Sequence, residues 1–281
     1  MTRYNDTERI RTLYDRISPY YRSLWGEHIH HGYWIRGDET KEQAQVQLIE
    51  HLAQLAGIAS GACILDVGCG FGATSIYLAR NYKAEATGIT ISPIQVEMAS
   101  KAASGAEVNA KFLLMDAQAM SFNRSFDVVW SVESISHYQN LQAFFASAAG
   151  LLKPGGTLAV IDWFKKENLK PAEYKKFIEP IEKGMLVELH TMQEYEAFMH
   201  SNRLQVSHNE ILNEHCAKSW DISLDIIKKK SFWALAARLG PGFVEHLRSF
   251  RAMKTGFASG NFVYGLLVAR KSQARRNDSA A

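Results

Sequence analysis

The chain has 281 residues, of which 47% are hydrophobic and 22% are charged, and its formal net charge is +3. This length suffices for one large α/β domain with added segments, and the composition is that of an ordinary globular protein. Because the charge is mild and the basic residues are scattered, the composition argues against a nucleic-acid partner.

The sequence shows no targeting signal and no membrane span. Its first residues lack the apolar core of a signal peptide, and no stretch approaches the roughly 20 apolar residues that cross a bilayer. The three cysteines, Cys63, Cys69 and Cys216, form no Cys-x-x-Cys pair and are odd in number, which argues against a disulfide framework or a zinc ribbon. We therefore expect a cytoplasmic protein without stable membrane insertion.

Residues 1–57 are predicted to form a helical lid. Aromatic side chains gather in its first half, and apolar residues recur at helical spacing over residues 46–55. The aromatic residues are Tyr14, Tyr20, Tyr21 and Trp25.

Residues 58–162 alternate short apolar strands with helices, which indicates a parallel sheet with right-handed crossovers. The predicted strands are 63–67, 84–89, 110–115, 126–131 and 157–161, the predicted helices are 73–81, 93–104 and 141–152, and a turn is predicted at 153–156.

After Asp162 the alternation stops. Residues 163–270 are predicted to form an aromatic, mostly helical cap together with the last two strands, at 204–212 and 261–269. The polar residues 271–281 are expected to be a disordered tail. The fold class is therefore α/β, with one nucleotide-binding core between a lid and a cap.

The first strand of the core ends in an acid, Asp66, and is followed by Gly68, Gly70 and Gly72. Glycines let the backbone turn tightly and leave room for a ligand, so the segment predicts a nucleoside site. Two ligands fit this spacing, a nicotinamide or flavin dinucleotide and S-adenosylmethionine.

A dinucleotide site normally has a carboxylate at the tip of the second strand, whereas this chain has Thr90, with Gln95 close behind. These neutral groups can bond the ribose, but the missing acid weakens both interpretations. Two acids favour S-adenosylmethionine. Asp116, followed by Ala117, comes just after the third strand, where its carboxylate can meet the amino group of adenine. Asp66 can order the glycine loop or reach the amino group of the methionine moiety.

At this point the chain resembles class I small-molecule methyltransferases that use S-adenosylmethionine, through residues 65–70, residues 88–92, Gln95 and the turn at 153–156. Residues 24–34 look like the N-terminal signature of the gamma-tocopherol methyltransferase group, which is related to sterol C-methyltransferases and cyclopropane fatty acid synthases. The resemblance implies a Rossmann-like, mostly parallel sheet with an antiparallel last strand. It also implies that an aromatic pair, here Tyr33 and Trp34, lies over the cofactor.

The expected cofactor site combines the glycine loop, the strand tips and this aromatic pair. No metal is expected, because His28, His30 and His31 lack supporting carboxylate or cysteine spacing. The residues expected to bind S-adenosylmethionine are Tyr33, Trp34, Asp66, Gly68, Cys69, Gly70, Thr90, Gln95, Asp116, Ala117 and Ser131.

The candidate catalytic residues follow the fourth and fifth strands. His137 is the first candidate for a general base or an acceptor contact, because an imidazole titrates near neutral pH and the segment resembles the Glu-Ser/Ala-x-x-His pattern of the family. Asp162 can orient His137 or bind the acceptor. Glu133 can perform either task, or stabilise a cation if the acceptor is an alkene.

The aromatic cap predicts a largely apolar pocket and therefore a hydrophobic or aromatic acceptor. The resemblance implies prenylated phenols, terpenoids or other secondary metabolites, with carbon or oxygen as the methylated atom. Two alternatives stay open, namely methylation, cyclisation or cyclopropanation of an alkene through a carbocation near Glu133, and a cofactor-binding scaffold without turnover. A homo-oligomer is compatible with the sequence.

Overall fold

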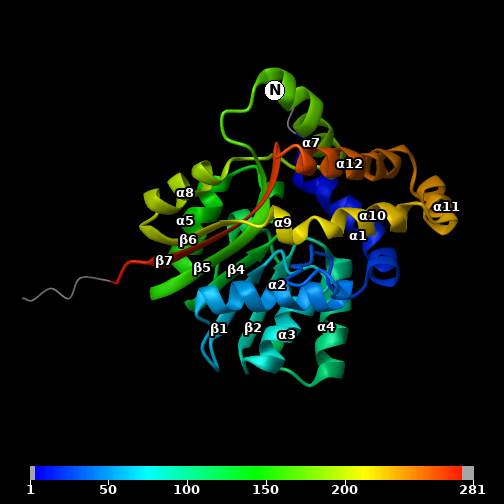
Figure 1. Ribbon diagram of the computed structural model, residues 1–281. Coiled ribbons are helices and arrows are strands. Elements are labelled where there is room, and N and C mark those ends of the chain that lie inside the picture. Colours follow the sequence, from blue (N-terminus) through cyan, green and yellow to red (C-terminus); the bar gives the residue numbers. More distant parts are fainter. Residues whose placement is uncertain (1–3, 274–281) are drawn as a thin grey trace, which may run out of the picture.

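A computed structural model of the chain describes residues 4–273. Its centre is a seven-stranded sheet with the order β3-β2-β1-β4-β5-β7-β6 (Figure 1). The strands are β1 Cys63–Val67, β2 Glu85–Thr90, β3 Ala110–Leu114, β4 Phe126–Val132, β5 Leu152–Lys165, β6 Leu204–Ile211 and β7 Phe262–Lys271. The α-helices are α1 Thr7–Trp25, α2 Lys41–Ala56, α3 Ala73–Asn81, α4 Pro93–Ala106, α5 Leu141–Leu151, α6 Pro171–Glu173, α7 Glu179–Met185, α8 Met192–Ser201, α9 Asn213–Cys216, α10 Lys218–Ile227, α11 Lys230–Leu239 and α12 Pro241–Ala258.

The first five strands are parallel, and β7 runs antiparallel between β5 and β6. This confirms the predicted α/β class and the antiparallel last strand. The strand order reverses between β1 and β4, so the carboxyl ends of these two strands open a crevice where ligands bind in such sheets.

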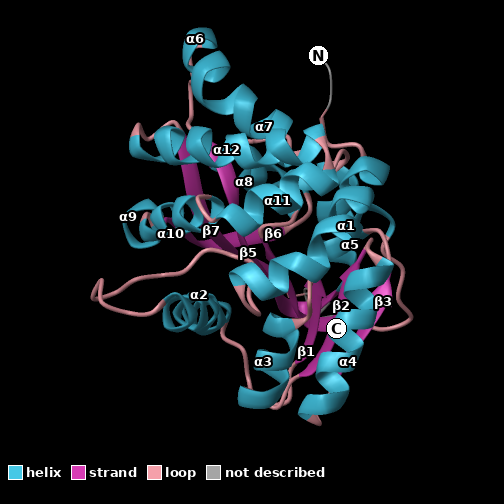
Figure 2. Ribbon diagram, turned by 90° about the vertical axis from the view of Figure 1, so that its right-hand side faces the viewer, coloured by secondary structure: helices cyan, strands magenta, loops and turns pink. Residues whose placement is uncertain are grey.

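Alternating side chains of the strands divide the core between the two faces of the sheet. Ile64 and Trp130 pack in the same cluster as α2 and α3, whereas Leu65 and Val129 pack in the cluster that contains α5 and α8. The central parallel strands β1 and β4 are largely buried because helices cover both faces of the sheet (Figure 2). The crevice is thereby held in a rigid frame.

Helix α1 joins this frame to the C-terminal helices. In Figure 1 it lies on the same side of the sheet as α7, α10 and α12, near the ends of the strands. Tyr21 of α1 contacts His246 of α12, and Arg16 donates to the carbonyl of Leu239 at the end of α11. The N-terminal and C-terminal segments therefore meet beside the crevice, although they are far apart in sequence.

Some predicted boundaries are wrong. The predicted turn at 153–156 lies inside β5, where the pairing with β4 shifts register and Gly155 has a φ of 77°. Lys271, placed in the disordered tail by the sequence, is the last residue of β7. The remainder of that predicted tail, from residue 274, lies outside the described residues.

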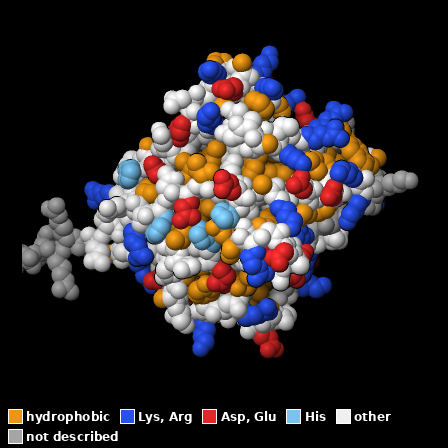
Figure 3. All heavy atoms as spheres, viewed as in Figure 1, with side chains coloured by type: hydrophobic (Ala, Val, Ile, Leu, Met, Phe, Trp, Pro, Cys, Tyr) orange, Lys and Arg blue, Asp and Glu red, His pale blue; other side chains and the backbone are white. Residues whose placement is uncertain are grey.

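The surface agrees with the mild charge of the sequence. On the face shown in Figure 3, basic and acidic side chains are interspersed with apolar ones and form no single basic stripe. Within residues 4–273, no helix combines the length and apolar character needed to cross a bilayer.

The ring of Phe112 in β3 packs into a space left by two glycines. A Cβ atom added to Gly88 would lie 2.6 Å from Phe112 Cδ1 and 2.9 Å from the Cβ atom of Cys69. A Cβ atom on Gly72 would lie 2.5 Å from Phe112 Cζ. These glycines therefore allow β3 to support the glycine loop from beneath.

We predict that Gly88→Ala lowers the free energy of unfolding by about 1–3 kcal/mol, because the added methyl group overpacks the Phe112 contact. The matched control is Gly105→Ala in α4, where an added Cβ atom meets nothing within 4 Å. This control is expected to be stabilised by up to about 1 kcal/mol through helix propensity. Urea denaturation of both variants tests the prediction, and equal stabilities would contradict it.

Candidate active site

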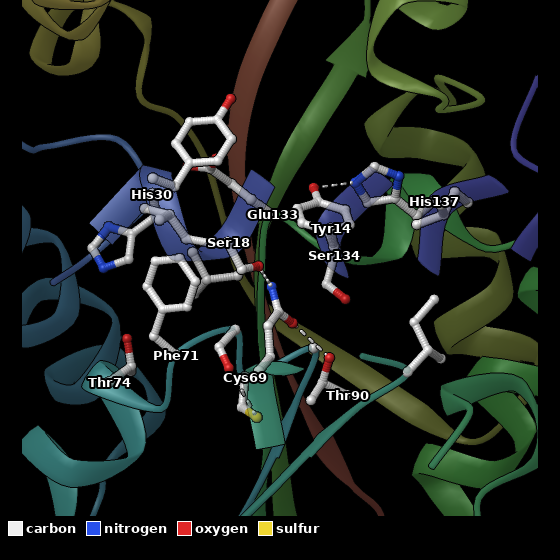
Figure 4. Close-up of a pocket in the computed structure, with 18 of the residues that line it drawn as sticks. Tyr14, Ser18, His30, Cys69, Phe71, Thr74, Thr90, Glu133, Ser134 and His137 are labelled. Carbon is white, nitrogen blue, oxygen red and sulfur yellow. Dashed lines mark hydrogen bonds between the residues drawn. The ribbon is translucent and has the colours of Figure 1, made fainter. Parts of the chain in front are cut away.

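A cavity lies at the carboxyl ends of β1, β2 and β4, and α1 forms one of its walls (Figure 4). Ten of the residues that the sequence assigned to the cofactor site or the catalytic site line it. They are Asp66, Gly68, Cys69, Gly70, Thr90, Gln95, Asp116, Ala117, Glu133 and His137.

The glycine loop passes directly against the segment that follows β4. Gly68 has a φ of 78°, and a Cβ atom at this position would lie 1.9 Å from Ser134 Oγ. The amides of Gly68 and Cys69 both donate to the carbonyl of Ile89, which fixes the loop to the tip of β2. Only glycine permits both this backbone angle and this approach.

Asp66 closes β1 beneath the loop. Its carboxylate accepts a 2.6 Å hydrogen bond from Ser75 in α3. Burial raises the pKa of Asp66 to about 6, although the hydrogen bond from Ser75 acts in the opposite direction. A buried carboxyl group of this kind favours an ammonium partner in the cavity, since a nearby positive charge offsets the desolvation of the carboxylate.

Hydrogen bonds between neutral side chains connect the tip of β2 to α1 of the lid. Thr90 Oγ1 donates to Gln95 Oε1 at 2.7 Å, and Gln95 Nε2 donates to Ser18 Oγ of α1 at 3.2 Å (Figure 4). Beside these hydrogen bonds, Ser92 donates to Asp15, which also belongs to α1. The residues expected at the ribose are therefore also those that hold α1 over the loop.

Asp116 follows β3 and caps the short helix η1, Ala117–Ala119. Its Oδ1 atom accepts from the amide of Gln118 at 2.9 Å. One carboxylate oxygen thus fixes the local backbone, and Asp116 and Ala117 together line the cavity.

Tyr33 and Trp34 do not lie over the glycine loop, and that expectation is wrong. Tyr33 stacks between the rings of His51 and His215, at centroid distances of 4.7 and 4.3 Å, and Trp34 is buried with its indole donating to the carbonyl of Glu39. Neither residue lines the cavity. The preceding residues 27–31 cover the site instead, and Ile29 lies 3.2 Å from the position of a Cβ atom on Gly70.

Ser131 was also expected at the cofactor, and it does not line the cavity. It lies within β4 between Trp130 and Val132, which both line the cavity. Neighbouring side chains of a strand point to opposite faces, so Ser131 points away from the face that Trp130 and Val132 present to the cavity, and it is fully buried.

His137 is held at both ring nitrogens. Its Nδ1 atom lies 3.0 Å from the carbonyl of Leu186, and its Nε2 atom lies 3.0 Å from the hydroxyl of Tyr14 in α1 (Figure 4). A carbonyl only accepts, so Nδ1 carries the proton and Nε2 accepts from Tyr14. Burial lowers the pKa of His137 to about 4, although the Leu186 carbonyl and the charge of Glu133 oppose this, so the ring is neutral at pH 7.

Asp162 is fully buried and does not line the cavity, so the expectation that it binds the acceptor is wrong. Its carboxylate accepts from the amide and the hydroxyl of Ser136, at 2.8 and 3.0 Å, and from Tyr195. Burial raises the pKa of Asp162 to about 7, although the hydrogen bonds from the amide of Trp163 and from Ser136 oppose this. Because Ser136 precedes His137 in the turn η2, Ile135–His137, Asp162 fixes the backbone that carries the histidine.

Glu133 begins the segment that leads to His137, and it has a φ of 52°, which is unusual for a residue with a side chain. Its Oε1 atom accepts from the amide of His31 at 2.7 Å, from His31 Nδ1 at 2.8 Å and from Tyr264 at 2.7 Å. Burial opposes the charge, yet the contacts with His31 hold the pKa of Glu133 below its usual value. The cavity therefore contains a buried carboxylate.

Several residues that line the cavity received no site role from the sequence. Tyr14, Ser18 and Tyr21 come from α1, and His246 comes from α12, far along the chain. The spacing of Tyr14 and Tyr21 was a usable signal, because residues seven apart lie on one face of a helix. His246 had no local signal, since only the packing of α12 against α1 and α7 brings it to the cavity.

The cofactor half of the cavity fits S-adenosylmethionine. Gly68 lines this half without a side chain that would intrude on a ligand, and the tip of β2 carries the neutral polar groups of Thr90 and Gln95. Asp66 is a buried acid without a basic partner in the hydrogen bonds described. Neutral polar groups suit the nucleoside, and the acid suits the amino group of its amino-acid tail.

Comparisons with known proteins agree with this geometry. The sequence model of the mycolic acid cyclopropane synthetase family matches residues 1–236. The chain is 32% identical over 262 residues to 27-O-demethylrifamycin SV methyltransferase of Amycolatopsis mediterranei, covering 92% of this chain and 95% of that protein. It is 38% identical over 176 residues to 2-methyl-6-phytyl-1,4-hydroquinone methyltransferase of Synechocystis, covering 59% of this chain and 54% of that protein.

The crystal structure of mycolic acid cyclopropane synthase complexed with S-adenosylhomocysteine shares the fold, with a TM-score of 0.84 and 20% sequence identity over 94% of this chain and 98% of that one. These matches rule out two of the earlier alternatives, namely a dinucleotide as the cofactor and a cofactor-binding scaffold without turnover. The chain belongs to the mycolic acid cyclopropane synthetase family and is a class I methyltransferase that uses S-adenosylmethionine.

Proposed function

We propose that this methyltransferase methylates a hydroxyl group of a hydrophobic or aromatic small molecule, with Tyr14 and His137 acting together as the general base. The observation that carries the proposal is the contact of 3.0 Å between Tyr14 Oη and His137 Nε2 on the wall of the cavity. His137 has no free nitrogen for the acceptor, so Tyr14 is the group that meets it.

The cofactor supplies a methyl group on a positively charged sulfur, which is transferred by in-line displacement. We propose that the backbone of the glycine loop, the Thr90–Gln95 pair and Asp116 hold it. The second oxygen of Asp116 remains for the amino group of adenine, because Oδ1 is used by the helix cap. The contribution of the protein is to hold the acceptor close to the methyl carbon and in line with it.

The relay moves one proton in two coupled steps. The acceptor hydroxyl donates to Tyr14 Oη and loses its proton to it, while the phenol proton of Tyr14 passes to His137 Nε2. Glu133 favours the resulting imidazolium, since its charge raises the pKa of His137. The oxygen exchanges a proton for a methyl group, and the proton remains on His137 until solvent removes it. General bases contribute roughly 10²- to 10⁴-fold to such reactions.

The walls around the relay support an apolar acceptor. Trp25, Trp163, Trp220, Phe250 and Met253 line the cavity together with it. The names of two relatives point to the same chemistry, since one acts on a demethylated rifamycin and the other on a hydroquinone with a phytyl chain. We therefore favour a prenylated phenol, a terpenoid or another secondary metabolite that carries a hydroxyl group.

A second function rests on Glu133. Its buried carboxylate lies among aromatic rings, where it can stabilise a cation formed when an alkene accepts the methyl group. The match to a cyclopropane synthetase family supports this alternative. The methylated atom distinguishes the two, because the relay acts on oxygen and the carboxylate on carbon.

We also propose the domain organisation and the cellular compartment that the sequence suggested. Residues 1–57 and 163–270 act as lid and cap on the core of residues 58–162, since both contribute walls of the cavity. The cytoplasm is the proposed compartment, because Cys63, Cys69 and Cys216 are free thiols, as is usual in a reducing environment.

Asp116→Asn is expected to weaken the binding of S-adenosylhomocysteine by about threefold to tenfold, because an amide loses the charge-assisted contact to adenine but can still cap η1. Isothermal titration calorimetry measures this. Asp225→Asn, in an exposed ion pair with Lys228, is the control and should bind as the wild type does. Unchanged affinity in Asp116→Asn would remove this residue from the cofactor site.

Tyr14→Phe and His137→Gln are each expected to lower the rate of methyl transfer by about 10²- to 10⁴-fold. The double variant should lose little more, because both residues serve one relay. The acceptor is first identified by transfer of a labelled methyl group into a metabolite extract of the source organism, and NMR then locates the methylated atom.

Tyr20→Phe on the same helix is the control, because Tyr20 does not line the cavity. All variants should retain their affinity for S-adenosylhomocysteine. A Tyr14→Phe enzyme with the full rate would refute the relay, and a labelled methyl group on carbon would favour the function built on Glu133.

A further inference from the structure

A second tyrosine–histidine pair lines the cavity and has no part in the proposed reaction. Tyr21 of α1 and His246 of α12 both reach the cavity, and Tyr21 Oη lies 2.7 Å from His246 Nε2. His246 is buried, with 3% of its surface exposed. Buried polar groups are stable when they are hydrogen-bonded, and these two side chains satisfy that condition by bonding each other.

The second pair repeats the geometry of the first. Tyr14 and Tyr21 are seven residues apart on α1, and in each pair the rings meet at an interplanar angle of 85°. The Nδ1 atom of each histidine contacts a backbone carbonyl at the end of α7, Leu186 for His137 at 3.0 Å and Gly184 for His246 at 3.1 Å. The two tyrosines are thus separated by about 10 Å along the helix axis, at ~1.5 Å per residue.

Close packing fixes the orientation of His246. A Cβ atom on Gly184 would lie 2.5 Å from the Cβ atom of Ser249 in α12, so α7 and α12 approach as closely as a glycine allows. Ser249 also donates to the carbonyl of His246. The carbonyl of Gly184 is therefore held beside Nδ1 of His246. It keeps the proton on Nδ1, so that Nε2 remains the nitrogen that accepts.

This arrangement determines which ligand group can bind. The carbonyl of Gly184 only accepts, so Nδ1 of His246 carries the proton and Nε2 accepts the hydroxyl proton of Tyr21. Burial lowers the pKa of His246 to about 4, although the Gly184 carbonyl opposes this, so the ring is neutral at pH 7. Tyr21 Oη then has only its lone pairs to offer. A hydroxyl group can donate to it, whereas an ether or a carbonyl oxygen cannot.

We propose that Tyr21 and His246 form a specificity-determining subsite that accepts a second hydroxyl group of the acceptor, about two helical turns from the reacting hydroxyl at Tyr14. This rests on the proposed function in taking Tyr14 as the position of the reacting group. Ile17, which lies between the two tyrosines on α1, lines the same cavity together with Phe250 and Met253 of α12, and these side chains suit an apolar body that carries the two hydroxyls. The substrate class is therefore an elongated, largely apolar molecule with a hydroxyl group at each end.

The test is calorimetry on the full chain saturated with S-adenosylhomocysteine, using three rigid probes. These are biphenyl-4,4′-diol, 4-hydroxybiphenyl and 4′-methoxybiphenyl-4-ol, which differ only at the far end. Wild type is expected to bind the diol about threefold to tenfold more tightly than the monool, beyond the statistical advantage of two equivalent ends. The methoxy compound should show no such gain, because its ether oxygen cannot donate.

Tyr21→Phe should abolish the preference for the diol while leaving the affinity for the monool and for S-adenosylhomocysteine unchanged. Tyr20→Phe, the matched control on the same helix, should keep the preference. If the pair only fastened α1 to α12, Tyr21→Phe would weaken diol and monool equally and lower the melting temperature. That result, or a wild type that does not prefer the diol, overturns the proposal.

The same experiment separates this subsite from the proposed reaction. It measures binding and not methyl transfer, so a failure of O-methylation leaves the preference for the diol in place. Conversely, Tyr14→Phe can abolish turnover while the difference between wild type and Tyr21→Phe persists. A preference that survives in Tyr21→Phe refutes the subsite alone.

Discussion

The contact between Gly68 and Ser134 is the constraint on which the site depends. The missing side chain of Gly68 allows the loop after β1 to pass directly against the segment after β4, where even one carbon atom would collide. These two strands are neighbours at the point where the strand order reverses. The cofactor loop and the segment that carries Glu133 and His137 are thereby fixed relative to each other by the sheet, which is the pre-organisation that methyl transfer requires.

Helix α1 completes both halves of the site with one rigid element. Ser18 reaches the Thr90–Gln95 pair on the cofactor side, and Tyr14 reaches His137 on the acceptor side. Successive turns of one helix therefore set the distance between donor and acceptor. Tyr14 contacts the one nitrogen of His137 that carries no proton, so in the proposed relay the lid takes part in the chemistry as well as excluding water.

The three carboxyl groups differ in their surroundings, although the sequence assigned Glu133 and Asp162 alike to the catalytic candidates. Asp66 lies at the cofactor loop, Glu133 faces the cavity, and Asp162 fixes the backbone before His137. Their partners differ. Asp66 accepts from Ser75, and Asp162 accepts from Ser136, Tyr195 and the amide of Trp163. Glu133, by contrast, accepts from the ring and the amide of His31 and from Tyr264. The pKa of each carboxyl group follows from these surroundings: it is raised by burial in Asp66 and Asp162 and held low in Glu133 by His31.

The sequence by itself determined the sheet, the glycine loop and the strand-end positions of His137 and Glu133, because strand alternation and glycine spacing are local properties of the chain. Tyr33, Trp34, Ser131 and Asp162 were placed wrongly in the cavity, since proximity in sequence does not specify which way a side chain points. The tertiary structure alone decided the partners of His137 and the position of His246. The first depends on the positions of α1 and of the end of α7, and the second on α12 packing against α7 and contacting α1. These contacts join segments far apart in the chain and leave no periodic trace in the sequence.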